Sequence, residues 1–236
     1  MTTPAPARVD GAAASVSEAL ASRMSCRAFL PDPVPGEMVR TLLEKATQAP
    51  SGGNLQPWHI YALGGDALEA LKADVREAQN SKPMGGPTEY EIYPNKLKDP
   101  YNARRRKCGE DMYAAINVPR EDKLGRLAQF KRNFELFDAP VGIFLYLDRT
   151  MGPPQWSDAG MYLQSLMLLA REAGLHTCAQ EAWALWHREL AAHLNPPEDL
   201  MLFCGVALGW MDRDAPINTV KTDRDVSDDV IKLTGF

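Results

Sequence analysis

A short segment near the start of the chain combines residues that suit close contact with a flat polar ligand. Residues 49–58 read Ala-Pro-Ser-Gly-Gly-Asn-Leu-Gln-Pro-Trp. The prolines fix φ, and the adjacent glycines allow positive φ and a close approach of the backbone. The side chains of Ser51, Asn54 and Gln56 add hydrogen-bond donors and acceptors. Such a turn suits the edge of a heteroaromatic ring, although an ordinary loop before a strand has a similar composition.

A second polar segment, residues 22–29, lies upstream and reads Ser-Arg-Met-Ser-Cys-Arg-Ala-Phe. Arg23 and Arg27 flank Ser25 and can grip a phosphate or a polyol chain through charge-assisted hydrogen bonds. Cys26 lies between the two arginines, which would lower the pKa of its thiol. No histidine occurs in a partner motif, so a packed thiol is favoured over a nucleophile.

Other candidates for side-chain chemistry lack the spacing they need. His187 and His193 are not placed to form a metal-ligating pair on one helical face. Ser51 lies in no Gly-x-Ser-x-Gly turn, and no Gly-x-Gly-x-x-Gly segment follows a strand pattern. These patterns predict no metal site and no catalytic side chain, so a bound cofactor would carry the reaction.

The composition bounds the class of protein. The chain has 236 residues, of which 45% are hydrophobic and 24% charged, enough for one domain with a full core. The net charge of −5 argues against nucleic acid as a partner. The longest uncharged apolar run, residues 159–170, is too short to span a membrane, and no signal peptide is recognisable. The scattered cysteines predict reduced thiols and a cytoplasmic location.

The hydrophobic pattern predicts helices and short strands in mixed order. Strands are expected at residues 58–63, 141–147, 176–180 and 200–210. Helices are expected at residues 15–22, 36–48, 66–78, 103–116, 121–137, 156–173 and 189–194. Strict alternation of strand and helix is lacking. The pattern therefore predicts an α+β domain whose sheet is mostly antiparallel, with about four or five strands surrounded by helices.

Two of the expected helices carry specific predictions about burial. The helix at 121–137 should bury an apolar face that includes Leu124 and Phe137. The helix at 156–173 is apolar on nearly every side. It should therefore be buried at a subunit interface or, alternatively, in the centre of a monomer.

Three segments are expected to differ from the folded core. Residues 1–14, rich in Ala, Pro and Thr, should be poorly ordered, and residues 15–236 should form the single domain. The excursion at 80–120 is rich in Pro, Gly and Tyr, which is typical of a functional cover. Its basic cluster at 104–107 is either a solvated helix face or an attractor of phosphate or carboxylate groups. The polar tail at 211–236 should extend onto a partner subunit.

The two polar segments, in this order and spacing, resemble the nitroreductase family of flavin enzymes. The resemblance rests on residues 23–29 and on residues 49–58, and it extends over nearly the whole chain. It implies the nitroreductase fold, an intertwined homodimer, FMN as the cofactor and NAD(P)H as the co-substrate. The cluster at 104–107 favours NADPH, because the 2′-phosphate of NADPH is anionic.

The resemblance also implies which residues contact FMN. They are Arg23, Met24, Ser25, Arg27, Pro50, Ser51, Gly52, Asn54, Gln56, Asn133, Gln180, Glu181, Ala182, Lys221 and Arg224. The first segment and the tail would hold the phosphate and ribityl chain. The turn at 50–56 would pack on the isoalloxazine ring from the other subunit, and residues 180–182 would lie beside its N5 edge. Met24 and Ala182 depart from the family, which often has Arg or His and Gly at these positions.

The activity that the resemblance implies is reduction of nitroaromatic compounds to nitroso and hydroxylamino products by a ping-pong mechanism. The excursion resembles that of the branch acting on substituted nitrobenzenes, and Tyr90, Tyr93, Tyr113 and Arg104 would contact the substrate. Two alternatives stay open. The same fold could reduce a quinone, an enone or a halogenated phenol, or the chain could bind flavin without turnover.

Overall fold

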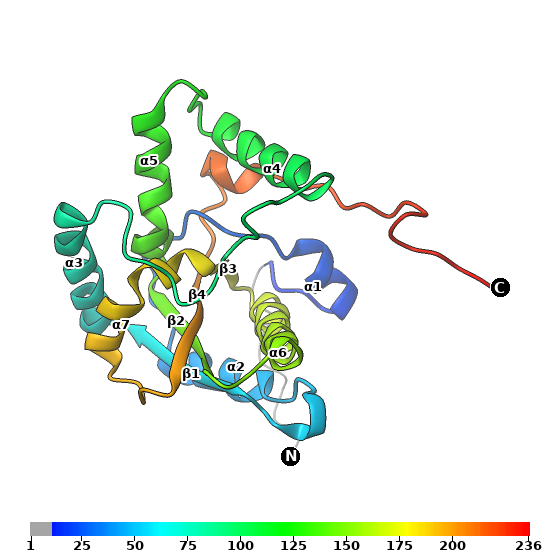
Figure 1. The fold of residues 1–236 in the computed structure, drawn as a ribbon, viewed down its shortest axis with the longest axis horizontal. Coiled ribbons are helices and arrows are strands. Elements are labelled where there is room, and N and C mark those ends of the chain that lie inside the picture. Colours follow the sequence, from blue (N-terminus) through cyan, green and yellow to red (C-terminus); the bar gives the residue numbers. More distant parts are fainter. Residues whose placement is uncertain (1–10) are drawn as a thin grey trace, which may run out of the picture.

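A four-stranded antiparallel sheet lies at the centre of the computed structural model, which describes residues 11–236 (Figure 1). The strands are β1 (Trp58–Gly64), β2 (Val141–Asp148), β3 (His176–Gln180) and β4 (Leu200–Gly209). Their order is β1-β2-β4-β3, and each neighbouring pair in this sheet is antiparallel. The predicted α+β class and antiparallel sheet are confirmed.

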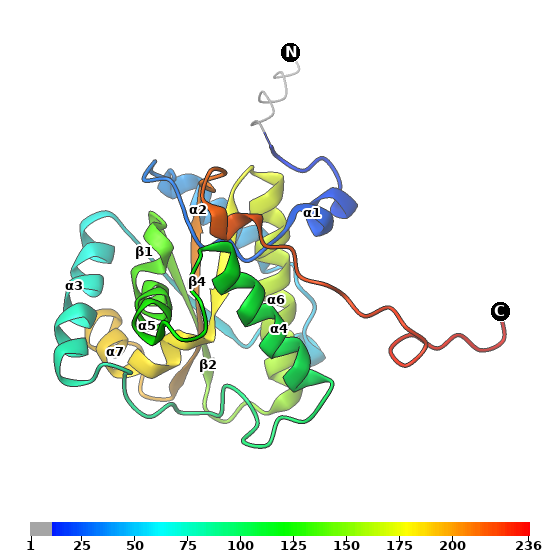
Figure 2. The same ribbon diagram turned by 90° about the horizontal axis from the view of Figure 1, so that it is seen from above.

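Helices lie on both faces of this sheet (Figure 2). They are α1 (Val16–Ser22), α2 (Gly36–Ala46), α3 (Gly65–Ser81), α4 (Tyr101–Ala115), α5 (Lys123–Lys131), α6 (Pro153–Glu172) and α7 (His187–Leu194). Short 3-10 turns complete the described elements: η1 (Gly52–Asn54), η2 (Arg132–Asp138), η3 (Glu181–Trp186) and η4 (Pro216–Thr219).

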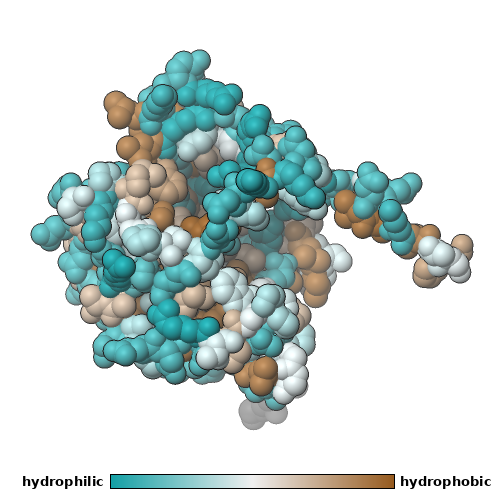
Figure 3. Space-filling model, in the orientation of Figure 1, coloured by the Kyte–Doolittle hydropathy of each residue, from teal (hydrophilic) through white to brown (hydrophobic). Residues whose placement is uncertain are grey.

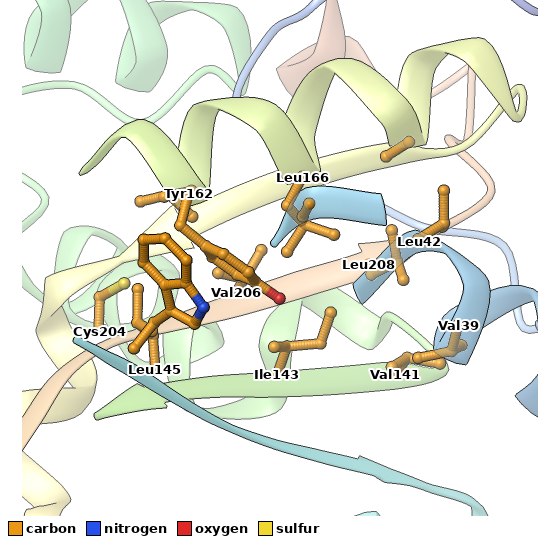
Figure 4. Packing of buried hydrophobic residues seen from close by; sticks show 14 of the residues in the cluster. Val39, Leu42, Val141, Ile143, Leu145, Tyr162, Leu166, Cys204, Val206 and Leu208 are labelled. Carbon is orange, nitrogen blue, oxygen red and sulfur yellow. The ribbon is translucent and has the colours of Figure 1, made fainter. Parts of the chain in front are cut away.

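The strand β2 is buried on both faces because its side chains alternate between two cores. Ile143 and Leu145 point into the core shared with α2 and α6, where they meet Tyr162 (Figure 4). Phe144 and Tyr146 point into the other core, which α3, η3 and α7 close. This explains why the sequence of β2 is a nearly continuous apolar run.

The long helix α6 is a core helix on one side and accessible on the other. Tyr162 and Leu166 are buried against the sheet, and the Tyr162 hydroxyl donates to the Leu43 carbonyl of α2 at 3.1 Å. On the other side Met161 is 37% exposed. The domain core, one of the two expected environments, is therefore confirmed for one side of α6, and its place at a subunit interface stays a prediction.

The segment between α4 and β2 is the main error of the secondary-structure prediction. A single helix was expected over 121–137, but α5 ends at Lys131 and the 3-10 turn η2 follows. Leu136 and Phe137 in this turn have φ of 53° and 55°, in the left-handed region that non-glycine residues rarely adopt. Both side chains are fully buried, so tertiary packing offsets the local backbone cost.

The prediction that Leu124 is buried is also wrong, because its side chain is 80% exposed. The reason lies in where α5 begins. The side chain of Asp122 caps the helix by accepting from the Gly125 N–H at 2.8 Å, which places Leu124 in the first turn, facing solvent.

The start of the described chain is held in place, contrary to the poor order expected for residues 1–14. Ala12 and Ala13 are buried, and the Ala13 N–H donates to the Arg171 carbonyl at 2.9 Å. The Arg171 guanidinium in turn donates to the Gly11 carbonyl at 2.6 Å. The expectation is therefore wrong for residues 11–14, and residues 1–10 lie outside the described part.

Acid should destabilise the fold through a buried histidine. His176 Nδ1 lies 3.1 Å from Arg171 Nη1, and burial, then the charges of Arg171 and Arg213, lower the pKa of His176 from 6.5 to about 3. Between about pH 6.5 and 3 the unfolded chain binds a proton at this position that the folded protein does not. Stability therefore falls as pH falls through this window, by up to about 1.4 kcal/mol per pH unit.

The measurement is urea denaturation from pH 7 to pH 4 for the wild type and His176→Asn. We expect a flatter dependence of the unfolding free energy on pH in this variant, because asparagine does not titrate. The exposed His59 provides the matched control, and His59→Asn should keep the wild-type slope. An unchanged slope in His176→Asn would contradict the assignment.

Candidate functional site

A cavity of about 1250 Å³ opens between α1, α4 and the C-terminal tail. Its walls are residues 20–25 with Arg27, one face of α4, and residues 218–225. Figure 2 shows the tail passing from η4 toward the open side of the molecule and then leaving its body. Two segments from opposite ends of the sequence thus form one site.

The helix α1 and strand β3 place the first of these segments. Ser15 caps α1 by accepting from the Glu18 N–H at 3.2 Å, and the helix ends where the Arg23 N–H donates to the Ala19 carbonyl. The chain then runs beside β3, where the Cys26 N–H donates to the Thr177 carbonyl at 3.0 Å. Arg23 and Ser25 consequently stand at the edge of the cavity.

Asn218 fastens the second segment to the first. Its Oδ1 accepts from the Arg27 N–H at 2.8 Å, although the two residues are 191 positions apart. Its Nδ2 donates to the carbonyls of Ala28 and Asp212 at 2.9 and 2.7 Å. Asn218 is buried, and through these bonds it directs the following residues, Lys221 to Arg224, along the cavity. Sequence reasoning missed this residue, because a single asparagine in a polar tail gives no local signal.

The cavity concentrates positive charge. Of the residues expected to contact the cofactor, those that line it are Arg23, Met24, Ser25, Arg27, Lys221 and Arg224. Burial, and then the positive charge of Arg224, lower the pKa of Arg23. No carboxylate within residues 11–236 forms an ion pair with the Arg23 guanidinium. Two guanidinium groups that repel each other in this way form a favourable binding site for an anion between them.

The glycine-rich turn at 50–56 lies away from this cavity. Gly53 has φ of 58°, which explains the need for glycine there, and the Gln56 N–H donates to Ser51 Oγ at 3.0 Å. The Gly52 N–H donates to Asp158 near the start of α6 at 3.2 Å. Arg171, near the other end of α6, contacts Ser22 beside the cavity. Positions 158 and 171 of α6 are about 20 Å apart at the usual helical rise.

The residues expected beside the flavin N5 edge also lie outside the cavity walls. Gln180 is buried at the end of β3, and its Nε2 donates to the Asn133 carbonyl at 2.8 Å and to Asn133 Oδ1 at 3.1 Å. At the rise of a strand, Gln180 lies about 10 Å from Thr177, the neighbour of Ser25. Glu181 is exposed and Ala182 is half-buried. Their contact with a cofactor stays a prediction.

The expected substrate tyrosines are engaged within their own chain. The Tyr90 hydroxyl donates to the Phe203 carbonyl, and its ring packs edge-on against Trp156 at 5.2 Å between centroids. Arg105 lies over the Tyr93 ring at 4.3 Å, and Arg126 lies over the Tyr113 ring at 4.2 Å. None of these three rings lines the described cavity, so their role as substrate contacts stays a prediction.

The part of the excursion that does line the cavity is α4. Arg104, Lys107, Cys108 and Asp111 form one side of it. Sequence reasoning proposed Arg104 as a substrate contact, but its guanidinium pairs with Asp225 of the tail. The tail acids Asp223 and Asp225 were missed, whereas Lys107 belongs to the basic cluster at 104–107 that the sequence indicated.

The side chains considered for covalent or metal chemistry have structural roles. Cys26 is buried, and burial raises the pKa of its thiol to about 12, as expected for a packed cysteine. His193 pairs with Asp74 at 2.6 Å, and His187 lies 3.3 Å from Glu89. Residues 11–236 hold no group of three or more His, Cys, Asp or Glu side chains placed to bind a metal. In the same range no helix has both the length and the apolar surface that a membrane crossing requires.

Known proteins similar to this chain include enzymes that act on nitro compounds. The chain is 36% identical over 209 residues to a nitrobenzene nitroreductase of Ectopseudomonas oleovorans, covering 89% of this chain and 92% of that relative. It is 34% identical over 217 residues to a 4-nitrobenzoate reductase of Pseudomonas putida, covering 92% of this chain and 94% of that relative.

Solved structures of nitroreductases have the same fold as this chain. The FMN and NADPH-dependent nitroreductase NfnB from Sphigopyxis sp. strain HMH is 45% identical, with a TM-score of 0.90 over 94% of this chain and 100% of that chain. The FMN-dependent nitroreductase NfnB from Mycobacterium smegmatis, solved in complex with NADPH, is 25% identical, with a TM-score of 0.87 over 92% of this chain and 97% of that chain. The Nitroreductase family model matches residues 20–210. The two polar segments of the sequence predicted this relationship correctly, and the chain belongs to the nitroreductase family.

Proposed function

We propose that the chain is an FMN-dependent enzyme that uses NAD(P)H to reduce nitroaromatic compounds to nitroso and hydroxylamino products. The observation that carries the proposal is the convergence of Arg23, Arg27, Lys221 and Arg224 on one cavity from both ends of a chain of this family. The names of the relatives that share most of its length support the nitro group as the acceptor. NADPH is favoured as the donor because the NfnB relative is NADPH-dependent.

The residues of the cavity fit the phosphate end of FMN. A phosphate ester carries up to two negative charges, and several cations are needed to hold it away from bulk water. An anion between Arg23 and Arg224 would offset the repulsion that lowers the pKa of Arg23. Ser25, beside them, supplies a hydroxyl group for the ribityl chain. The volume of about 1250 Å³ exceeds the roughly 300–1,000 Å³ of a typical ligand pocket.

The residues of the chain bind and orient, whereas FMN when bound supplies the hydride and electron transfer. Arg23, Lys221 and Arg224 would hold the phosphate of FMN. Arg27 Nη1 donates to the Ser25 carbonyl at 3.2 Å, and its positive charge would serve the pyrimidine side of the flavin. NAD(P)H and the nitroarene would bind at this site in turn, which would give ping-pong kinetics. No side chain is assigned a catalytic role, and protons would come from water or from the reduced flavin.

The proposed enzyme is a homodimer whose two copies complete each other's sites. The turn at 50–56 and the cavity lie near opposite ends of α6 in one chain, so the turn serves the cavity of the second copy. Leu55 in this turn is 55% exposed, and Met161 on the outer side of α6 is 37% exposed. The tail, whose hydrophobic side chains stand away from the body in Figure 3, packs on the second copy.

The location that we propose is the cytoplasm. The four cysteines are free, and three of them, Cys26, Cys178 and Cys204, are buried. Burial raises the pKa of Cys178 to about 11, so its thiol stays protonated at neutral pH. Free thiols without disulfides are typical of a reducing compartment.

The function is tested with the purified protein under anaerobic conditions. We expect a yellow protein with about one FMN per subunit, because the site is dedicated to one cofactor. NADPH should bleach the colour, and 4-nitrobenzoate should then restore it by taking two electrons to the nitroso level. A second equivalent of NADPH should take the nitroso compound to the hydroxylamino product. A quinone and an iodophenol, tested in parallel, should be reduced more slowly. A protein that stays colourless with added FMN would overturn the proposal, as would a flavoprotein that 4-nitrobenzoate cannot reoxidise.

A further inference from the structure

Two ion pairs fasten the C-terminal tail to α4 at the mouth of the cavity. Lys107 Nζ lies 3.0 Å from Asp223 Oδ2, and Arg104 Nη2 pairs with Asp225 Oδ2. Lys107 also pairs with Asp111 of its own helix at 2.6 Å. The hydrogen bonds to Asp111 and Asp223 raise the pKa of Lys107, so it stays charged at neutral pH.

The spacing of these residues matches the two elements that carry them. Arg104 and Lys107 are three positions apart on a helix, so they stand on the same face of α4. Asp223 and Asp225 are two positions apart in a non-helical segment, where alternate side chains share a side. Arg224, between the two acids, is left free to face the cavity that it lines.

Arg224 is held close to the tail backbone by its own hydrogen bonds. Its Nη1 donates to Thr222 Oγ1 and to the Asp223 carbonyl, each at 2.8 Å. A guanidinium has five N–H donors, so its other nitrogens can still reach an anion. The position of Arg224 therefore follows the position of the tail.

Within the single chain, ion pairs and not apolar burial hold residues 221–225 of the tail in place. All residues from 221 to 236 are exposed, so the segment has no core that could hold it. Its last buried anchor is Asn218. Beyond that anchor, the contacts of Asp223 and Asp225 with α4 are the long-range polar contacts that the structure describes for the tail.

We propose that Arg104 and Lys107 are positioning residues for the cofactor phosphate, because by holding Asp225 and Asp223 they keep Arg224 facing Arg23 across the cavity. The inference rests on the proposed function and deepens it. It changes the role of Arg104 from the expected substrate contact to a residue that acts through the tail. We call the four paired residues Arg104, Lys107, Asp223 and Asp225 the tail clasp.

The decisive variant is Asp223→Asn with Asp225→Asn, in otherwise unchanged full-length protein. It removes two negative charges near a cation-rich cavity. If only the net charge of the site mattered, FMN would bind more tightly. If the tail clasp positions Arg224, FMN should bind more weakly. The direction of the change therefore separates the two explanations.

The measurement is the dissociation constant of FMN and of riboflavin, from the fluorescence of the free flavin in titrations of the protein freed of cofactor. Exposed ion pairs are individually weak and are screened by salt. We therefore expect FMN affinity to fall about 3- to 10-fold at low salt, with a smaller difference at high salt. Riboflavin, which lacks the phosphate, should keep its affinity.

Two controls accompany this variant. Asp228→Asn with Asp229→Asn makes the same change of charge in the same tail, where the structure describes no ion pair, and should not weaken FMN binding. Asp223→Glu with Asp225→Glu keeps both charges, so its FMN affinity should stay near that of the wild type. FMN affinity that is unchanged or higher in the decisive variant, or an equal loss for riboflavin, would overturn the tail clasp. A wild type that binds neither flavin would instead overturn the proposed function and, with it, the tail clasp.

Discussion

Arg23→Ala should lower the affinity of the protein for FMN about 30-fold while leaving riboflavin binding nearly unchanged. Hydrogen bonds to charged groups contribute about 1.5–3 kcal/mol each, and about 2 kcal/mol corresponds to roughly 30-fold. Arg23 is the half-buried cation at the junction of the two chain ends, and it faces Arg224 across the cavity. The loss should therefore be confined to the phosphate end of the cofactor.

The same variant should not destabilise the protein freed of cofactor. Within residues 11–236 no carboxylate pairs with Arg23, and its charge opposes that of Arg224. Removing it relieves a repulsion and breaks no ion pair. Titration of both flavins and thermal unfolding of the cofactor-free protein test the two halves of the prediction.

Arg23→Lys and Arg40→Ala are the matched variants. Lysine keeps the charge but loses the planar fork of donors, so the FMN affinity of Arg23→Lys should lie between those of the wild type and Arg23→Ala. Arg40 is an exposed arginine of α2 that pairs with Glu44 and does not line the cavity, so its removal should leave the affinity for both flavins unchanged. Equal losses for FMN and riboflavin in Arg23→Ala would show that Arg23 does not bind the phosphate.

Trp183→Ala should lower the free energy of unfolding by about 3–5 kcal/mol, which is the usual cost of removing a large buried aromatic side chain. Trp183 is fully buried in η3, and its ring packs edge-on against Phe144 at 5.1 Å and Phe134 at 5.8 Å between centroids. It joins η3, β2 and η2, so a cavity at this position would loosen three elements at once.

The neighbouring glycine explains why this site cannot relax easily. A Cβ built on Gly205 of β4 would lie 2.4 Å from Trp183 Cδ1, so the indole ring already fills the space over the strand. Protein interiors are close-packed, and neighbours collapse only partly into a vacated volume. The full cost of the lost ring should therefore appear in the measured stability.

Urea denaturation at neutral pH tests this prediction. Trp183→Phe should cost much less, because an aromatic ring still packs against the two phenylalanines. Leu124→Ala should change the unfolding free energy by less than about 0.5 kcal/mol, since surface substitutions rarely do more. If Trp183→Ala were as mild as Leu124→Ala, the core described around η3 would be wrong.

The sheet could be predicted from sequence because its strands carry a local signal. β2 is an apolar run because both of its faces are buried, and the same holds for most of β4. The wrong prediction of a single helix over 121–137 has an equally clear cause. Leucine and phenylalanine are common in helices, so nothing local marks Leu136 and Phe137 as a break. Their left-handed backbone is stable only because both side chains are buried in a core assembled from distant elements.

The residues of the candidate site likewise fall into those that the sequence indicated and those that only the structure revealed. The arginines at 23 and 27 were recognisable from residue type and spacing, since a phosphate needs cations. The basic residues of the tail were indicated by the family resemblance. The bonds of Asn218 and the pairing of Arg104 with Asp225 had no local signature. Both join residues more than a hundred positions apart.

The amino-acid sequence alone determined the family, the α+β class and the basic residue types that would hold an anionic cofactor, because these depend on local pattern and composition. Only the tertiary structure decided which of these residues share a cavity and which serve another role. Arg104 pairs with Asp225 of the tail, and the segment at 50–56 lies at the end of α6 away from the cavity. The physical reason is that charges and hydrogen-bonding groups act over a few ångströms, and only folding brings distant residues within that range.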